Sequence, residues 1–252
     1  MSLIPWTVRK QFKIIFLLLL IIGIIGGVFL YFLIRPTCLD GKQNQGEKGI
    51  DCEGPCSAQC LGEIKPMVVV WVKPVEVGNG KYDAVALIEN PNLFLGARSV
   101  DYQMKIYDKS NIMLGVRTGK TFVGPGERFV VFEASLSVGN KIPQSATIDF
   151  GGNIKWEKIT RDENSVVVVG KNFTNDGFAR LKTTISNKSF LPVKNIFISA
   201  ILYDKDKNII GASSSKIDYI AGEASQEAAF TWPKKFEVEP DSIEVLLRTG
   251  LE

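Results

Sequence analysis

The sequence predicts an all-β protein of two tandem β-sandwiches that follow one N-terminal transmembrane α-helix. Three observations lead to this prediction. One long apolar run lies near the N-terminus, short β-branched or aromatic runs bounded by Gly, Pro and Asn follow it, and a repeat is found at a shift of 96 residues. After the first apolar run, no segment sustains a 3.6-residue amphipathic period, so a helical fold is excluded for the rest of the chain.

The N-terminal apolar run extends from Ile14 to Ile34 and contains 21 consecutive uncharged residues rich in Leu and Ile. As a helix it would be about 31 Å long, which matches the hydrocarbon thickness of a bilayer. A cleaved signal peptide has a shorter apolar region and a small-residue cleavage site, whereas this run ends in Arg35-Pro36. We therefore predict an uncleaved transmembrane helix over 14–34, with residues 1–13 as a cytoplasmic tail.

Charge is divided unevenly along the chain. Four of the 30 basic residues lie within residues 1–35, where there is no acid, so the other 217 residues carry 26 basic and 27 acidic side chains. Excess Lys and Arg mark the cytoplasmic flank of a span, and Arg9, Lys10 and Lys13 precede the helix, although basic residues also follow it. The nearly neutral remainder has no basic stripe for a phosphate backbone, so nucleic acid is not expected as a partner.

The chain contains no histidine. Nucleophilic pairs that rely on imidazole, and imidazole metal ligands, are therefore excluded. We find no Gly-rich phosphate loop, no cofactor fingerprint and no carboxylate dyad in a supporting context. We expect no enzyme and no catalytic or cofactor-binding residues. The alternative is an envelope hydrolase that uses carboxylates or a Ser-Lys pair, for which Ser213 to Ser215 are serine candidates without a supporting motif.

All four cysteines lie in a polar, turn-rich collar over residues 36–60, at Cys38, Cys52, Cys56 and Cys60. The collar cannot form a hydrophobic core, so it needs disulfides or a metal. The cysteines are separated by thirteen, three and three residues, unlike the two tight pairs of most zinc sites. This favours two disulfides, with the connectivity left open. Cysteines confined to one side of the helix indicate an oxidising compartment, which predicts an extracytoplasmic C-terminal ectodomain.

The collar also offers a set of oxygen ligands, at Asp40, Asn44, Glu47 and Asp51. Such hard ligands are what Ca²⁺ uses, although their spacing is not that of an EF-hand loop. The alternative is that these side chains cap the backbone amides of their own turns. A calcium-responsive surface adhesion module is therefore a further alternative function, and calcium is the one cofactor left open.

The collar contains the pattern Cys-x-Asp-Gly-x-x-Asn, then Glu, then Asp-Cys-x-Gly-x-Cys, from Cys38 to Cys56. This pattern resembles a short cysteine module of bacterial exported and envelope proteins. Glu53 replaces the first Gly of that module's Gly pair, and Cys60 follows Cys56 by four positions rather than three. The resemblance implies a bacterial surface protein and no established activity.

The repeat indicates tandem domains, which we place at 66–160 and 161–252. The residues matched at a shift of 96 are Tyr107/Tyr203, Asp108/Asp204, Lys109/Lys205, Gly115/Gly211, Gly126/Gly222 and Glu127/Glu223. With one extra residue, the match extends to Asn90/Asn187, Pro143/Pro240 and Ser145/Ser242. Each copy is long enough for a seven- or eight-stranded sandwich with its own core.

One strand of each copy shows why the repeat is structural. In the first copy, apolar residues alternate with polar ones at Val100, Tyr102, Met104 and Ile106. The equivalent positions of the second copy are Ile196, Ile198, Ala200 and Leu202. A tight polar connection follows each strand and predicts a hairpin, with the Asp of Tyr-Asp capping the turn. Pro125-Gly126 predicts a type II turn with positive φ at the Gly.

The second copy contains Leu202-Tyr203-Asp204 and Ile209-Ile210-Gly211, and it resembles the FxLYD-type domains of prokaryotic exported proteins, with Ala200 in place of the motif's Phe. The first copy, with its Asn90-Pro91-Asn92 turn and its Met104–Asp108 strand, is similar to water-stress (late-embryogenesis-abundant type 2) domains. The resemblance implies immunoglobulin-like β-sandwiches without a known catalytic centre.

These observations predict a membrane-anchored, extracytoplasmic and non-enzymatic binding or spacer protein of the bacterial cell envelope. Its expected partners are the membrane, through the Ile14–Ile34 helix, and an envelope protein or a surface polymer. Gly23 and Gly27 have the small-xxx-small spacing that lets two membrane helices approach closely, which offers a route to a homodimer. Glycine is also simply common in membrane helices.

Overall fold

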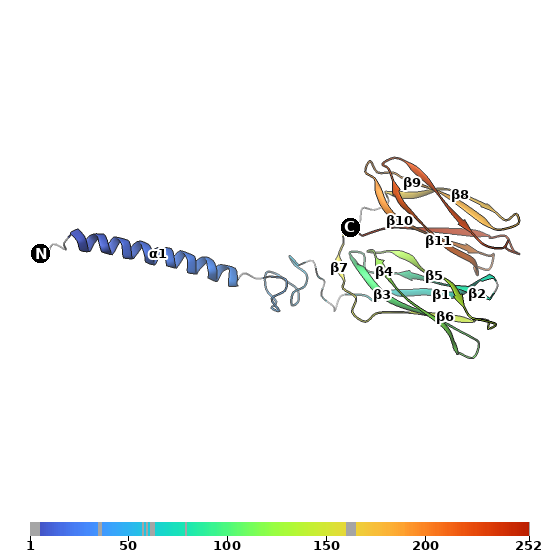
Figure 1. Cartoon of the computed structure of the whole chain (residues 1–252), viewed down its shortest axis with the longest axis horizontal. Helices are drawn as coiled ribbons and strands as arrows, with labels where there is room; N and C mark the ends of the chain where they lie inside the picture. The colour runs from blue at the N-terminus through green and yellow to red at the C-terminus, as the bar shows by residue number, and fades with distance from the viewer. Residues whose placement is uncertain are drawn as a thin grey trace. The chain divides into compact units, whose positions relative to one another are not determined.

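The computed structural model describes residues 6–34, 37–56, 58, 60, 64–78, 80–159 and 165–251. The chain divides into two compact units, Met1–Cys60 and Leu61–Glu252. The first unit holds the helix and the collar, and the second holds all the described strands (Figure 1). The predicted fold class, all-β after one apolar helix, is confirmed.

Helix α1 spans Trp6–Ile34 and contains the predicted run 14–34. Its segment Lys13–Tyr31 is long and apolar enough to cross a membrane, and none of it is buried inside the protein. The core helix of a soluble protein would be covered by other elements, so the exposure of α1 fits an anchor surrounded by lipid. The orientation of the helix, and pairing through Gly23 and Gly27, stay predictions.

Two antiparallel sheets form the first sandwich. The strands of one sheet, ordered β1-β2-β5, are β1 (Val68–Gly78), β2 (Lys81–Glu89) and β5 (Arg128–Ser137). The strands of the other, ordered β4-β3-β6, are β3 (Leu95–Tyr107), β4 (Met113–Val123) and β6 (Ser145–Phe150). The short strand β7 (Glu157–Lys158) pairs with the start of β3. Ile88, Met104, Ile106 and Phe129 lie fully buried in the core between the sheets.

Two further antiparallel sheets form the second sandwich. The strands of one sheet, ordered β12-β9-β8, are β8 (Val166–Thr174), β9 (Arg180–Asn187) and β12 (Ser225–Thr231). The strands of the other, ordered β11-β10-β13, are β10 (Val193–Tyr203), β11 (Ile209–Ile220) and β13 (Ser242–Thr249). Leu181, Ile185, Ile196 and Phe230 lie in its core. The predicted domain boundary at 160/161 lies outside the described residues and stays a prediction.

The inward-facing positions predicted from alternation are confirmed. In β3, Val100, Met104 and Ile106 are buried and Tyr102 is half-buried, and all four equivalent residues of β10 are fully buried. Both hairpins form, β3 with β4 and β10 with β11. Asn111 and Lys207 take the same turn position, with φ of 58° and 62°.

One part of the repeat alignment is wrong by a residue. The Asn90 N–H donates to the carbonyl of Glu127, and the Asn187 N–H donates to the carbonyl of Ala224. Glu127 therefore corresponds to Ala224, and Gly126 to Glu223, which share a positive φ of 56° and 57°. The slip arises because β11 has 12 residues where β4 has 11.

Gly126 has the positive φ that the predicted turn requires, whereas Gly222, which corresponds to Pro125, is required for a different reason. A Cβ at residue 222 would collide with the backbone carbonyl of Phe190. Gly222 therefore allows two loops to approach closely, whereas Gly126 supplies a left-handed backbone conformation.

Candidate functional site

The four collar cysteines form two disulfides, Cys38–Cys56 and Cys52–Cys60, and none is free. The predicted disulfides are confirmed, and the structure gives the connectivity that the sequence left open. Since disulfide sulfurs are not thiolates, they do not offer the ligands of a structural zinc site.

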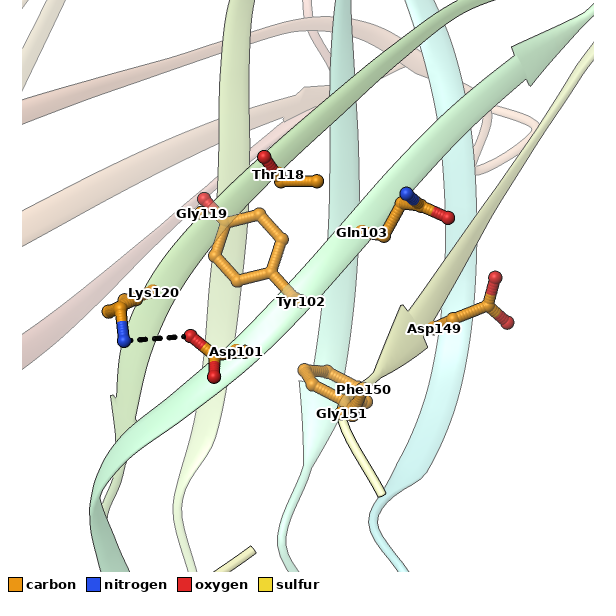
Figure 2. A pocket seen from close by; sticks show the side chains of 9 residues that line it. All are labelled: Asp101, Tyr102, Gln103, Thr118, Gly119, Lys120, Asp149, Phe150 and Gly151. Atoms are coloured by element: carbon orange, nitrogen blue, oxygen red, sulfur yellow. Dashed lines mark ion pairs between the residues drawn. The ribbon is translucent and has the colours of Figure 1, made fainter. Parts of the chain in front are cut away.

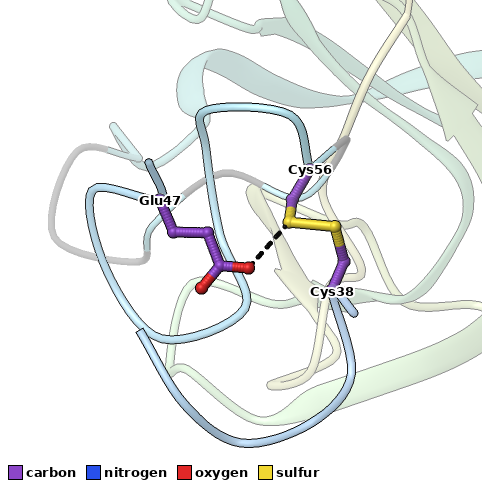
Figure 3. A group of neighbouring side chains, drawn as sticks. All are labelled: Cys38, Glu47 and Cys56. Atoms are coloured by element: carbon purple, nitrogen blue, oxygen red, sulfur yellow. Dashed lines mark hydrogen bonds between the residues drawn. A yellow bond between two sulfur atoms is a disulfide. The ribbon is translucent and has the colours of Figure 1, made fainter. Parts of the chain in front are cut away.

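Glu47 lies at the centre of the collar beside the first disulfide (Figure 3). Its Oε2 accepts hydrogen bonds from the backbone N–H groups of Asn44 (3.1 Å) and Asp51 (3.3 Å). Its Oε1 lies 3.0 Å from Cys56 Sγ, a sulfur that carries no hydrogen because it is bonded to Cys38. Cys38, Glu47 and Cys56 are therefore spaced like metal ligands, but only the carboxylate could bind an ion.

The structure brings the four predicted calcium residues together. The Asp51 carboxylate accepts from the N–H groups of Asp40 (3.0 Å) and Gly41 (2.9 Å), and Asp40 Oδ2 accepts from Asn44 Nδ2 at 2.9 Å. The hydrogen bond from Asn44 lowers the pKa of Asp40. These contacts support the alternative reading, in which the side chains cap turn amides. Calcium binding stays a prediction, and Asn44 Oδ1 is buried without a hydrogen-bond partner among the described residues.

The recurring Tyr-Asp corners have the structural role that the repeat predicts. Asp108 Oδ1 accepts from the N–H groups of Ser110 and Ile112, both at 2.9 Å, and the bond from Ile112 lowers the pKa of Asp108. Asp204 Oδ1 accepts from the N–H groups of Asp206 (2.9 Å) and Asn208 (2.8 Å). Each aspartate caps its hairpin turn.

A third apolar cluster lies between the two sandwiches. Val85, Leu87 and Val130 of the first sandwich pack there with Ile201 and Ala212 of the second. Strands β2 and β10 are therefore buried on both faces along part of their length. The sequence carries a signal for this burial, because residues 84–88 form a continuous apolar run, which is typical of a strand covered on both sides. We call this cluster and the polar network beside it the junction.

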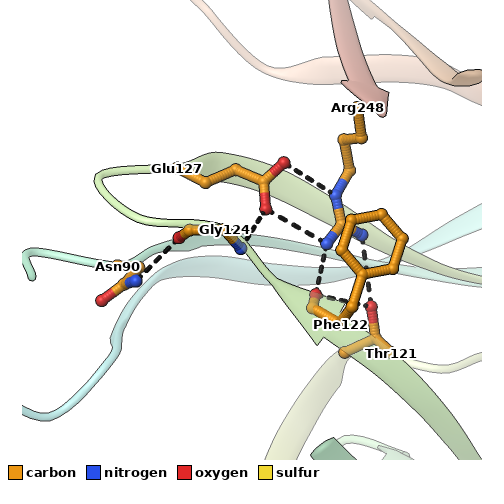
Figure 4. A network of polar contacts seen from close by, with 6 residues as sticks. All are labelled: Asn90, Thr121, Phe122, Gly124, Glu127 and Arg248. Carbon is orange, nitrogen blue, oxygen red and sulfur yellow. Dashed lines mark hydrogen bonds and ion pairs between the residues drawn. The ribbon is translucent and has the colours of Figure 1, made fainter. Parts of the chain in front are cut away.

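Arg248 of β13 forms the polar centre of the junction (Figure 4). It is 6% exposed, and its Nε and Nη2 lie 3.1 and 3.3 Å from the two carboxylate oxygens of Glu127. Its Nη1 donates to Thr121 Oγ1 at 3.2 Å, and its Nη2 also donates to the carbonyl of Phe122. The guanidinium stacks over the rings of Phe122 and Phe129, 4.0 and 4.3 Å from their centroids.

Glu127 is as fully buried as its partner. It is 4% exposed, and its Oε2 accepts from the Gly124 N–H at 2.7 Å. Burial of two charges is unfavourable unless both are paired and hydrogen-bonded, a condition that this network meets. A more exposed pair, Arg128 Nη1 with Glu244 Oε1 at 3.4 Å, also crosses the junction. The two sandwiches are thus joined by directional contacts as well as by apolar burial.

A hollow of about 530 Å³ lies on the β4-β3-β6 sheet (Figure 2). Its polar lining includes Asp101, Gln103, Thr118, Lys120 and Asp149. Lys120 pairs with Asp101 at 3.0 Å, and Asp149 pairs with Lys105 at 2.9 Å. Because these charges are balanced, the hollow offers hydrogen-bonding groups rather than a strong field.

Tyr102 and Gly119 belong to the same hollow. The Tyr102 hydroxyl donates to Glu133 Oε1 at 2.6 Å, and its ring leaves no room for a Cβ at Gly119. Burial, followed by the bond to Glu133, raises the pKa of Tyr102. The hydrogen bond to Glu133 and the contact with Gly119 therefore hold the Tyr102 side chain in one position beside the hollow.

The serine candidates of the alternative hydrolase lie on β11, at a second hollow of about 400 Å³ that includes Ser214, Ser215 and Lys216. Lys216 Nζ lies 2.7 Å from Asp218 Oδ1 and 5.6 Å from the centre of the Phe197 ring. The amine thus contacts a carboxylate rather than a serine hydroxyl, which gives the Ser-Lys alternative no support.

No family model and no curated protein matches the chain. Among solved structures, the chain is similar to the crystal structure of red sea bream transglutaminase, with 10% sequence identity and a TM-score of 0.21. The match covers 72% of this chain and 29% of that structure. A likeness this distant carries no argument about fold or activity.

Proposed function

We propose that this protein is a membrane-anchored, non-enzymatic spacer and binding module of the bacterial cell envelope, with a cytoplasmic N-terminus and an extracytoplasmic β unit. The observation that carries the proposal is the junction, in which Arg248 and an apolar cluster join the two sandwiches. A joined pair of sandwiches holds a surface at a fixed place relative to its neighbour, as a spacer requires.

The first unit supports the same proposal. Helix α1 has the length and composition of a membrane span, and both disulfides lie directly after it in sequence. Disulfides persist in oxidising compartments and are rare in the cytosol, which favours an exported β unit. This proposal includes the assignment of the first sandwich as a water-stress-type domain and of the second as an FxLYD-type domain.

The binding surface is proposed from the equivalence of the two copies. The outward face of β10 packs against the first sandwich, where Ile201 is fully buried. The equivalent strand of the first copy is β3. Its outward residues Asp101 and Gln103 line the hollow together with Thr118 of the neighbouring strand β4. We propose that this face, which we call the β3 face, binds an envelope protein or a surface polymer.

Photo-crosslinking in cells tests this proposal. A photoreactive amino acid replaces Thr118, which is exposed at the hollow, and a control protein carries it at Lys182, which is exposed on the central strand of the β12-β9-β8 sheet. We expect an adduct from position 118 that is absent from position 182. Protease digestion of the adduct then separates a protein partner from a polymer.

Two results would contradict the proposal. If the protein is not recovered with membranes, the proposed membrane anchor is wrong. If positions 118 and 182 are labelled equally and deletion of the gene has no phenotype, the proposed binding role of the β3 face is wrong.

A further inference from the structure

The second unit exposes an apolar pair at an equivalent loop of each sandwich. Leu93 and Phe94 are 70% and 73% exposed, and Phe190 and Leu191 are 85% and 75% exposed. The loops follow β2 and β9, which are equivalent strands of the repeat. We call these two pairs the apolar tips. Exposed apolar residues grouped in this way mark an interaction surface.

A buried asparagine shapes each loop. Asn90 Nδ2 donates to the carbonyls of Leu95 and Gly124, both at 2.7 Å. Asn187 Nδ2 donates to the carbonyls of Leu191 (2.8 Å) and Ala221 (3.0 Å). Because these buried hydrogen bonds fix the loop backbone, an ordered loop rather than a flexible segment presents each apolar tip.

Both tips lie at the same end of the unit. The Ile159 N–H donates to the carbonyl of Phe94 at 3.2 Å, and the Lys188 N–H donates to the carbonyl of Ser165. Residues 159 and 165 are only six positions apart in the sequence, so the two loops they contact are separated by at most about 20 Å.

The chain enters the β unit at this same end. Asn92 exchanges two hydrogen bonds with the backbone of Lys65, at 2.9 and 2.8 Å. Lys65 is among the first described residues of the unit, and the chain that leads to it comes from α1 through the collar. The tips thus lie where the unit is tethered to the part of the chain that carries the anchor.

Lysines accompany the apolar tips. Lys65 contacts the first loop, Lys158 pairs with Leu95 beside it, and Lys188 begins the second loop. Within the described part of the chain, none of these three lysines forms an ion pair. Apolar side chains flanked by free cations are suited to the boundary between acyl chains and phosphate headgroups.

We propose that the apolar tips contact the lipid bilayer that holds α1, with Leu93, Phe94, Phe190 and Leu191 entering the interface and the lysines meeting lipid phosphates. The anchor and the tether at this end together favour lipid over a protein partner. This inference rests on the proposed anchoring and adds a second, peripheral attachment of the β unit to the same membrane.

The test uses the full chain reconstituted in vesicles of phosphatidylglycerol and phosphatidylcholine, with bromines on the upper part of the acyl chains to quench nearby tryptophan. Phe94→Trp and Phe190→Trp report on the tips. Ile142→Trp and Val238→Trp are matched controls, because these residues are 65% and 55% exposed. They lie in loops that contact Tyr107 and Tyr203, at the opposite ends of β3 and β10. Quenching is measured as the excess over the unaltered protein, which contains four tryptophans.

We expect excess quenching in the F94W and F190W proteins and none in the I142W and V238W proteins. It should weaken when Lys65, Lys158 and Lys188 are replaced by Glu. If the chain floats with the vesicles but the tip variants are quenched no more than the controls, the tips do not contact lipid and the proposed anchoring stands. If the chain does not float with the vesicles, the anchoring and the bilayer contact are both wrong.

Discussion

Strands β3 and β10 occupy the same place in the two sandwiches, yet their outward faces are opposite in character. The outward residues of β3 include Asp101 and Lys105, which pair with neighbouring charges. Those of β10 include Phe197 and Ile201, and Ile201 is fully buried against the first sandwich. The inward residues are apolar in both strands. The comparison teaches that inward positions determine the fold of each copy, while outward positions determine which copy is covered.

The turn that holds Glu127 shows the same division. Its backbone pattern recurs at Ala224, including the hydrogen bond to a buried asparagine. Only the first copy has a carboxylate there, and Arg248 of the second copy binds it. Each copy therefore supplies one half of the buried pair, and the junction is heterologous.

Breaking the buried pair should have the largest effect. Replacement of Arg248 by Ala removes the guanidinium that pairs with the buried Glu127 carboxylate, so we expect a loss of about 3–5 kcal/mol in the free energy of unfolding. Chemical denaturation followed by tryptophan fluorescence measures this loss. Arg117→Ala, at an exposed arginine of β4, is the control and should change stability little. The double variant R248M/E127L should recover most of the loss, and no difference between R248A and R117A would contradict a stabilising junction.

The outward faces can be compared directly at equivalent residues. Ile201→Ala removes a fully buried side chain from the junction and should cost about 3 kcal/mol. Lys105→Ala alters the equivalent position on β3, where it removes a surface ion pair, and should cost about 0.5 kcal/mol. Denaturation midpoints measure both. Equal costs would mean that the outward face of β10 is not covered in solution.

An effect smaller than those of Arg248→Ala and Ile201→Ala depends on pH. Tyr102 and Tyr203 donate to Glu133 and Glu244, and burial, followed by these bonds, raises the pKa of both tyrosines above the ordinary 10.0. The unfolded chain then releases these protons at lower pH than the folded chain. Their contribution to stability is complete below pH 10 and is lost as pH rises above it.

Denaturation at a series of alkaline pH values measures this loss. The variants Y102F and Y203F should each lose about 1 kcal/mol near neutral pH and show a flatter decline above pH 10. An unchanged alkaline slope in both variants would show that these tyrosines do not titrate differently in the folded state.

Much of the fold follows from local pattern. The alternation around Met104 and Ile198 identifies the inward residues, and the Tyr-Asp corners identify the hairpins, because each depends on neighbours in sequence. The compartment suggested by the cysteines likewise predicts the disulfides but not their pairing, since connectivity depends on how the collar turns around Glu47.

The junction could not be predicted in the same way. Arg248 is one arginine near the end of a strand, and nothing within its own segment indicates Glu127, 121 residues away, as its partner. The continuous apolar run at residues 84–88 indicates burial on both faces but does not name the covering strand. The repeat alignment is wrong at Glu223 for a similar reason. Strand β11 is one residue longer than β4, and nothing in the local sequence marks where the extra residue lies.

The pair of Arg248 and Glu127 also limits how the protein could have grown by duplication. In the first copy, the position equivalent to Arg248 is Gly151, which follows β6 as a bare backbone beside Asp101. In the second copy, the position equivalent to Glu127 is Ala224. A third domain added at either end would meet a surface that lacks its half of the pair. A third copy could dock through the same kind of buried pair only if an arginine replaced Gly151 or an acid replaced Ala224.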